Sequence, residues 1–110
     1  MQNLFSIANL PAHPMDEEII QTLLRGDRGL RVERIISNGH VTQETRWYDQ
    51  DEDEWVLVLQ GSARLLMEDA TEVALKAGDH VLLPAHKKHR VVYTSSPCIL
   101  LAICHSKLQH

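Results

Sequence analysis

The feature that most constrains the fold is a series of short, largely apolar segments that follow one another at even spacing from Leu30 onward. Turn-forming residues such as Asn38-Gly39 separate these segments, and no helical pattern lies between them. Many short strands in succession favour an antiparallel sandwich or barrel over a parallel sheet with crossover helices. We therefore predict an all-β, single-domain antiparallel β-barrel or jelly roll. Its strands are expected at Leu30–Ser37, Glu54–Gln60, Ala63–Glu68, Glu72–Lys76, His80–Leu83, Arg90–Thr94 and Cys98–His105.

One stretch before these strands has the pattern of a short helix. Pro14 opens it, Asp16 and Glu17 make its first turn acidic, and Gly26 is a plausible stop. Apolar residues recur at helical spacing at Ile19, Ile20, Leu23 and Leu24. We expect residues 1–29 to form an N-terminal segment whose helix packs on a barrel of residues 30–110, all within one domain.

Composition and charge limit the classes of partner. The chain has 110 residues and a formal charge of −4, and its acidic and basic residues are mixed along the sequence. No cationic stripe is available to neutralise a phosphate backbone, so we expect no nucleic-acid partner. Met1–Leu10 lacks the pattern of a secretory leader, and no apolar run is long enough to span a bilayer. We predict a cytoplasmic protein without membrane association.

Two cysteines, Cys98 and Cys104, fall in the last predicted strand. At strand rise their Cα atoms would be about 20 Å apart. A disulfide bond spans at most about 7 Å between Cα atoms. We therefore predict two buried free thiols.

Two motifs in the strand region resemble those of the cupin family. Glu54 is followed by six residues and then Gly61, which reproduces the Glu-x6-Gly half of the first cupin motif. The spacing from Gly78 to Pro84 to His89 reproduces the second motif. In these residues the chain resembles a small single-domain cupin of the RmlC-like jelly-roll superfamily. The resemblance implies a barrel with one divalent metal ion at its mouth, held by Glu54 and His89.

The sequence departs from the family where the first motif carries a His-x-His pair. Depending on the spacing, the positions of that pair hold Tyr48 and Gln50 or Trp47 and Asp49. His86 replaces the internal glycine of the second motif and, with His89 and Glu54, would supply two histidines and one carboxylate. Non-haem iron oxygenases use that ligand set, and zinc, manganese and nickel also accept it.

Other side chains complete the predicted site. Asp49 or Gln50 could add an oxygen ligand, and Tyr48 and Tyr93 are in register to line the pocket. Two alternatives stay open: His86, beside two lysines, could be solvated, and Glu54 could pair with an arginine instead of a metal ion.

Two classes of function fit these features. The first is a metal-dependent enzyme, dioxygenase-like or isomerase-like, acting on a small polar molecule. The alternative is a non-catalytic barrel that binds or senses a sugar, an organic acid or a metal ion, which the loss of both first-motif histidines supports. Of the two classes, we predict the metal-dependent enzyme. In both, the partner is a small molecule.

The pattern also predicts self-association. Trp55–Leu59 is apolar on both faces of its expected strand, so a second copy of the chain could supply one cover. The apolar segment Asn3–Leu10 could extend the same contact. We predict a homodimer with a two-fold interface.

Overall fold

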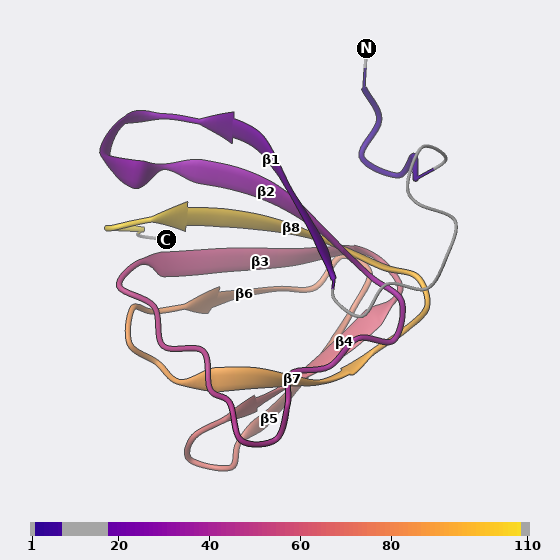
Figure 1. Ribbon diagram of the computed structural model, residues 1–110, viewed down its shortest axis with the longest axis vertical. Coiled ribbons are helices and arrows are strands. Elements are labelled where there is room, and N and C mark those ends of the chain that lie inside the picture. Colours follow the sequence, from indigo (N-terminus) through magenta and orange to yellow (C-terminus); the bar gives the residue numbers. More distant parts are fainter. Residues whose placement is uncertain (1, 8–17, 109–110) are drawn as a thin grey trace.

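The computed structural model describes residues 2–7 and 18–108, and nearly all regular structure in these residues is β-strand (Figure 1). The predicted all-β antiparallel fold is confirmed, and each predicted strand is present with its ends within about two residues of those expected. The strands are β1 (Ile19–Arg25), β2 (Arg31–Ser37), β3 (Asp53–Gln60), β4 (Ser62–Met67), β5 (Glu72–Lys76), β6 (His80–Leu83), β7 (His89–Thr94) and β8 (Cys98–His105).

The strands form two antiparallel sheets that face each other. The larger sheet has the order β1-β2-β8-β3-β6, and the smaller has the order β5-β4-β7. In Figure 1 the larger sheet makes the upper wall of the barrel and the smaller sheet the lower wall. Strands distant in sequence are therefore neighbours: β2 and β3 both pair with β8, the last strand of the chain.

The core lies between the two sheets and follows the two-residue period of a strand. In β3, the side chains of Glu54, Val56 and Val58 are buried, and the residues between them are more exposed. The buried cluster joins both sheets through Val56, Val58, Leu65, Met67, Leu75 and Leu83. The same alternation that builds this core also turns Glu54 inward.

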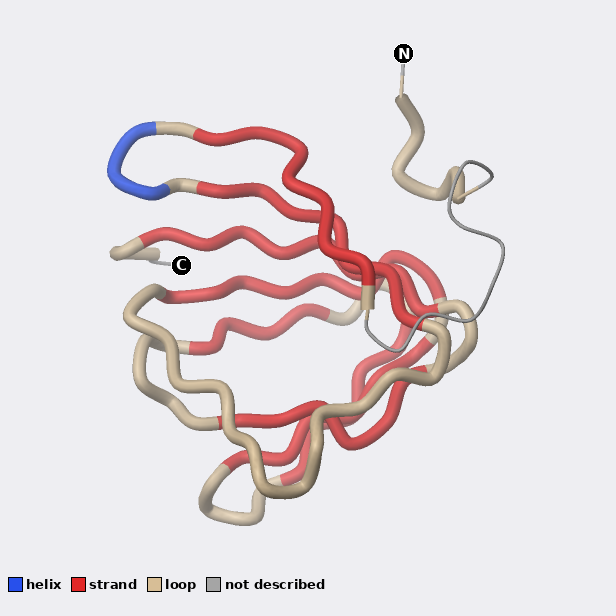
Figure 2. The backbone as a smooth tube through the Cα atoms, viewed as in Figure 1, coloured by secondary structure: helices blue, strands red, loops and turns tan. Residues whose placement is uncertain are grey.

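The predicted N-terminal helix is wrong over residues 19–25, which form β1 instead. This strand pairs antiparallel with β2, from Ile19 opposite Ile36 to Arg25 opposite Arg31. The connection to β2 contains Gly26 and a short 3-10 turn at Asp27–Gly29 (Figure 2). The part of the predicted helix before Glu18 lies outside the described residues.

The physical reason for this correction is that backbone propensity and pairing with β2 outweigh the helical spacing of the apolar residues in 19–25. The β-branched residues Ile19, Ile20 and Thr22 favour extended backbone. The free edge of β2 also offers hydrogen-bond partners to any strand beside it. Pairing with that edge decides the conformation.

Gly61 in the first motif has a clear structural role in the turn between β3 and β4. Its φ is +84°, and a Cβ atom there would lie 2.2 Å from the Ser95 hydroxyl and 2.6 Å from the Pro97 carbonyl oxygen. Only glycine fits such a close approach. The turn is thereby held against the connection between β7 and β8.

Cys98 and Cys104 are both buried and free, as predicted. Burial raises the pKa of both thiols, and that of Cys104 reaches about 12 with the charge of Glu54 as a further cause.

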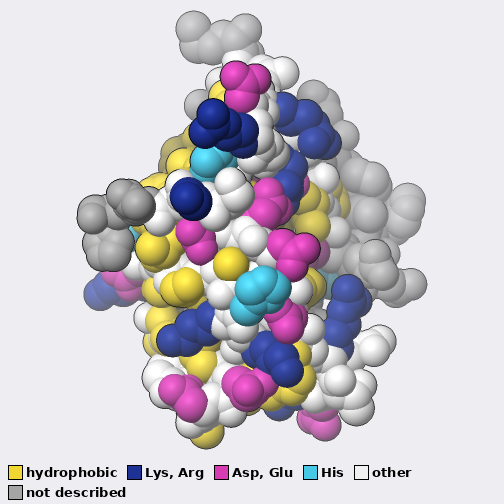
Figure 3. Space-filling view, turned by 90° about the vertical axis from the view of Figure 1, so that its left-hand side faces the viewer, with side chains coloured by type: hydrophobic (Ala, Val, Ile, Leu, Met, Phe, Trp, Pro, Cys, Tyr) yellow, Lys and Arg dark blue, Asp and Glu magenta, His cyan; other side chains and the backbone are white. Residues whose placement is uncertain are grey.

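Acidic, basic and apolar side chains are interspersed over the face in Figure 3. Within residues 2–7 and 18–108, no helix has the length and apolar character needed to cross a membrane.

Candidate functional site

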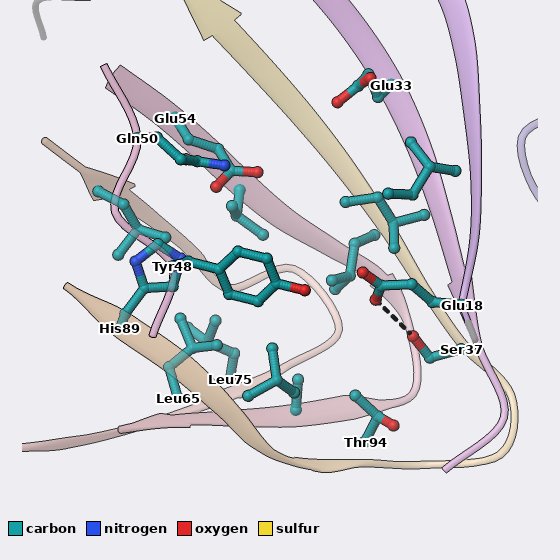
Figure 4. Close-up of a pocket in the computed structure, with 17 residues that line it drawn as sticks. Glu18, Glu33, Ser37, Tyr48, Gln50, Glu54, Leu65, Leu75, His89 and Thr94 are labelled. Carbon is teal, nitrogen blue, oxygen red and sulfur yellow. Dashed lines mark hydrogen bonds between the residues drawn. The ribbon is translucent and has the colours of Figure 1, made fainter. Parts of the chain in front are cut away.

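A cavity of about 130 Å³ lies between the two sheets (Figure 4). Most of its wall is apolar and includes Ile35, Val56, Leu65 and Leu100. Its polar lining consists of Glu18, Glu33, Ser37, Tyr48, Gln50, Glu54, His89 and Thr94. An engineered apolar cavity of about 150 Å³ holds benzene. At about 130 Å³ this cavity is slightly smaller, so a compact molecule no larger than about one small ring is the size that suits it.

Glu54 projects into the cavity from β3, between β6 and β8. The residue is 9% exposed, and its carboxyl group makes no hydrogen bond or ion pair with any residue that the structure describes. Burial raises the pKa of this carboxyl to about 7, the negative charges of Glu33 and Glu18 add to the rise, and Arg31 opposes it. Such a group is only partly ionised at neutral pH.

His89 lies at the start of β7 with its ring held in place. Its Nδ1 atom is 3.0 Å from the Lys87 carbonyl oxygen. Because a carbonyl oxygen can only accept, Nδ1 carries a proton, and in the neutral ring Nε2 is left as an acceptor. The ring also stacks on Tyr48, with 5.6 Å between centroids. The residue is 6% exposed and lines the cavity.

Tyr48 and Gln50, one of the two pairs that could stand where the family's motif has histidines, also line the cavity. The backbones of Tyr48 and His89 exchange two hydrogen bonds, of 2.8 and 3.2 Å, which tie the loop before β3 to β7. The Gln50 carbonyl oxygen accepts a 2.8 Å hydrogen bond from the backbone of His86. In Figure 4 the Gln50 side chain lies beside the Glu54 carboxyl group, above the Tyr48 ring.

Three residues of the predicted site lie outside this cavity. The His86 ring is exposed and pairs through Nδ1 with Asp49 at 2.9 Å, and its Nε2 lies 3.5 Å from Asp51. Neither His86 nor Asp49 lines the cavity. Tyr93 is 39% exposed, packs under Arg64 and borders a separate surface hollow. The structure therefore brings Glu54, His89, Gln50 and Tyr48 together and separates the other three from them.

Sequence reasoning missed two carboxylates of the cavity, Glu33 and Glu18. Glu33 alternates with Ile35 and Ser37 along β2, so the two-residue period could have placed all three on one face. Glu18 directly precedes β1 and accepts a hydrogen bond from the Ser37 hydroxyl at 3.4 Å (Figure 4). The expected helix concealed its position.

The residues present do not fit the predicted metal site. A two-histidine, one-carboxylate site requires three strong ligands around one ion. Glu54 and His89 supply two, and the donors beside them, Gln50 and Tyr48, are a neutral amide and a phenol, which bind weakly. The other carboxylates of the cavity, Glu18 and Glu33, do not form a metal-binding group with Glu54 and His89. Among residues 2–7 and 18–108, no group of three or more His, Cys, Asp and Glu side chains is arranged to hold a metal ion. Iron, manganese, zinc or nickel therefore stays a prediction from the sequence.

Solved structures with the same fold include one at substantial sequence identity. A protein from Ralstonia eutropha JMP134, described as a candidate mannose-6-phosphate isomerase, is 40% identical, with a TM-score of 0.85 over 97% of this chain and 98% of that one. A cupin superfamily protein from Desulfitobacterium hafniense DCB-2 is 20% identical, with a TM-score of 0.71 over 92% and 88%. KdgF from Halomonas sp. is 16% identical, with a TM-score of 0.67 over 81% and 80%, and these last two show the fold alone.

A comparison of the chain with protein families supports the resemblance seen in the two motifs. No curated protein matches the chain significantly. The family described as Cupin domain matches residues 34–104, which contain both motifs and the paired strands around them. Because the match spans more than half of the sequence, the chain belongs to the cupin family.

Proposed function

We propose that this protein binds a small organic molecule inside the barrel, with Glu54 as its polar anchor. The observation that carries the proposal is a carboxyl group that is nine-tenths buried, faces a cavity and lacks a partner among the described residues. Burying such a group without a partner costs free energy, which a ligand with a complementary polar group would recover.

The rest of the cavity supports this proposal. Ligand pockets are typically apolar, with a few polar groups that fix the orientation of the ligand. Here the apolar wall surrounds a polar corner made by Glu54, Gln50, Tyr48 and His89. The Nδ1 contact and the ring stacking of His89 fix its direction before any ligand arrives, which reduces the entropy cost of binding.

Proton transfer on the bound molecule is a second candidate function. Glu54 and His89 line the same cavity, and a carboxyl group with a pKa of about 7 can both take and return a proton near neutral pH. In an isomerisation, Glu54 would carry a proton from one carbon to its neighbour while a second proton moves between two substrate oxygens through Nε2 of His89. Both steps move only protons, so the substrate and its isomer have the same atoms and no oxidant is needed.

The relative described as a candidate isomerase also favours this class. Interconversion of mannose 6-phosphate and fructose 6-phosphate is a direct assay, with Glu54→Gln as the background. We expect no turnover of this doubly negative substrate, because the cavity is lined by three carboxylates. A rate above that background would identify the substrate and refute the charge argument.

The metal-dependent enzyme is not the function we propose, because the donors at the cavity do not make a three-ligand site. The homodimer and the cytoplasmic location stay predictions from the sequence.

Binding is tested by titrating ¹⁵N-labelled, chelator-dialysed protein with benzyl alcohol, benzylammonium and benzoate, each a single ring of suitable size. At least one of these compounds, at millimolar concentration, should shift the backbone amide signals of residues around the cavity. Ala63→Leu, which adds bulk at the cavity wall, should abolish those shifts. Ala74→Leu makes the same change at an exposed position of β5 and should leave them intact. No cavity shifts with any of the three compounds would contradict the proposal.

A further inference from the structure

We propose that the ligand of this cavity is a small organic cation, with an ammonium group held by Glu54 and a compact apolar body against the barrel wall. This inference rests on the proposed function, binding inside the barrel, and adds the chemical class of the ligand.

The charge of the cavity wall is one-sided. Three carboxylates from three separate segments line it: Glu18 before β1, Glu33 in β2 and Glu54 in β3. No lysine or arginine among the described residues lines it. The negative charge therefore favours a positive ligand.

The nearby arginines offset only part of this charge. Arg31 approaches Glu33 to 3.7 Å, but it lies closer to Glu52, at 2.8 Å. Arg46 packs over the Tyr48 ring at 5.4 Å and lines a neighbouring hollow, not the cavity. Both cations thus act from outside the cavity wall.

Glu54 supplies an independent observation that a ligand belongs there. Glu33 has Arg31 and Glu18 has the Ser37 hydroxyl, whereas Glu54 has no such partner among the described residues. Glu54 is buried, whereas Glu18 and Glu33 are only partly buried, and its side chain points into the cavity beside Gln50 (Figure 4). An ammonium group would give this carboxylate a charge-assisted hydrogen bond in a site shielded from water.

The remaining wall defines the rest of the ligand. Ile35, Val56, Leu65 and Leu100 offer apolar surface, and the cavity of about 130 Å³ admits about one ring. The stacked rings of Tyr48 and His89 add further surface to the same wall. A phosphate ester would instead meet three carboxylates with no cationic side chain to bind it.

The test compares three ligands of one size and shape that differ in charge: benzylammonium, benzyl alcohol and benzoate. Dissociation constants are measured by calorimetry or NMR with the full chain after dialysis against a chelator. Benzylammonium should bind about tenfold more tightly than benzyl alcohol, as expected for a hydrogen bond between charged groups. Benzoate should bind more weakly than both.

Variants assign the preference to the cavity carboxylates. Glu54→Gln should lower the affinity for benzylammonium about tenfold and change that for benzyl alcohol by less than about threefold. Glu33→Gln should weaken benzylammonium binding by a smaller factor, and it serves as a second probe if Glu54→Gln unfolds. Asp51→Asn alters a side chain that is 95% exposed and outside the cavity, so it should have no effect.

The outcomes separate this inference from the proposed function. If none of the three compounds binds, cavity binding itself fails. If benzyl alcohol or benzoate binds as tightly as benzylammonium, the cavity binds ligands but the cation preference is wrong. Tight retention of Zn²⁺ or Mn²⁺ that blocks benzylammonium would also overturn the inference, in favour of the metal site expected from the sequence.

Discussion

Replacing Glu54 with glutamine should stabilise the folded protein at alkaline pH and leave its stability unchanged in acid. The carboxyl group is nine-tenths buried and lacks a partner among the described residues, so its ionised form is disfavoured in the folded state. Glutamine keeps nearly the same shape and carries no charge. The substitution therefore removes the cost of burying the charge without opening a cavity.

The magnitude follows from the shift of the pKa. Burial and the neighbouring carboxylates raise it from 4.5 to about 7. One pKa unit corresponds to about 1.4 kcal/mol, so the full effect is about 3 kcal/mol. Because the pKa of Glu54 is higher in the folded state, the contribution of its protonated form to the free energy of unfolding is fully present below about pH 4.5. That contribution is lost as pH rises to about 7. At about pH 8 the wild-type protein should be about 3 kcal/mol less stable than Glu54→Gln, and at about pH 4 the two should be equal.

Urea unfolding followed by tryptophan fluorescence measures this difference, since Trp47 and Trp55 provide the signal. Both proteins should first be dialysed against a chelator. Carboxyl groups far from Glu54 titrate in the same way in both proteins, so the difference between the two reports Glu54 together with its interaction with Glu33 and Glu18. In thermal melts at about pH 8, the midpoint of the variant should rise by about 10 °C or more.

Asp51→Asn is the matched control, because its side chain is 95% exposed and should give no pH-dependent difference. The reasoning would be refuted if Glu54→Gln were equally or less stable than wild type at about pH 8. That result would mean that the ionised carboxylate has a cationic partner in the folded protein.

Four further outcomes are expected. His86→Gly should change the free energy of unfolding by no more than about 1 kcal/mol, because it relieves a positive φ of 64° and loses only exposed pairs with Asp49 and Asp51. Ligand binding should persist in this variant, and loss of binding would place His86 at the site. A thiol reagent at about pH 8 should label Cys98 and Cys104 only after urea is added, since both are buried and their pKa values are raised; rapid native labelling would contradict this. Elemental analysis of untagged protein should find iron, manganese, zinc and nickel well below one per chain. A full equivalent of any of them would contradict the conclusion that the side chains of the cavity do not form a metal site. Light scattering at micromolar concentration should give twice the chain mass of 12.5 kDa if the sequence-based homodimer is correct, and a monomer mass would remove it.

Much of the fold could be predicted because its strands carry local signals. Alternating apolar residues and turn glycines such as Gly61 and Gly78 mark where each strand begins and ends. β1 could not be recognised in this way. Ile19, Ile20, Leu23 and Leu24 follow a helical period, and pairing with the free edge of β2, a tertiary feature, overrides it.

The candidate site was harder to predict from the sequence, because the direction of each side chain determines which residues belong to it. Motif spacing selected Glu54 and His89, and both line the cavity. His86 is only three residues from His89, but its left-handed backbone, where the family's motif has glycine, turns its ring toward Asp49 outside the cavity. Glu33 belongs to a correctly predicted strand, yet which face of that strand is buried depends on pairing with β8.

The departures from the family's motif and the charge of the cavity have one physical explanation. Histidines at the positions of Tyr48 and Gln50 would help bind a divalent ion, whose charge would offset that of Glu54. With a phenol and an amide there, the carboxylate keeps its place on β3 but has lost that means of compensation. Glu33 and Glu18 add negative charge to the same wall. The carboxyl group must then either hold a proton or meet a cation from outside, which is why its pH dependence and its ligand preference test the same electrostatic property.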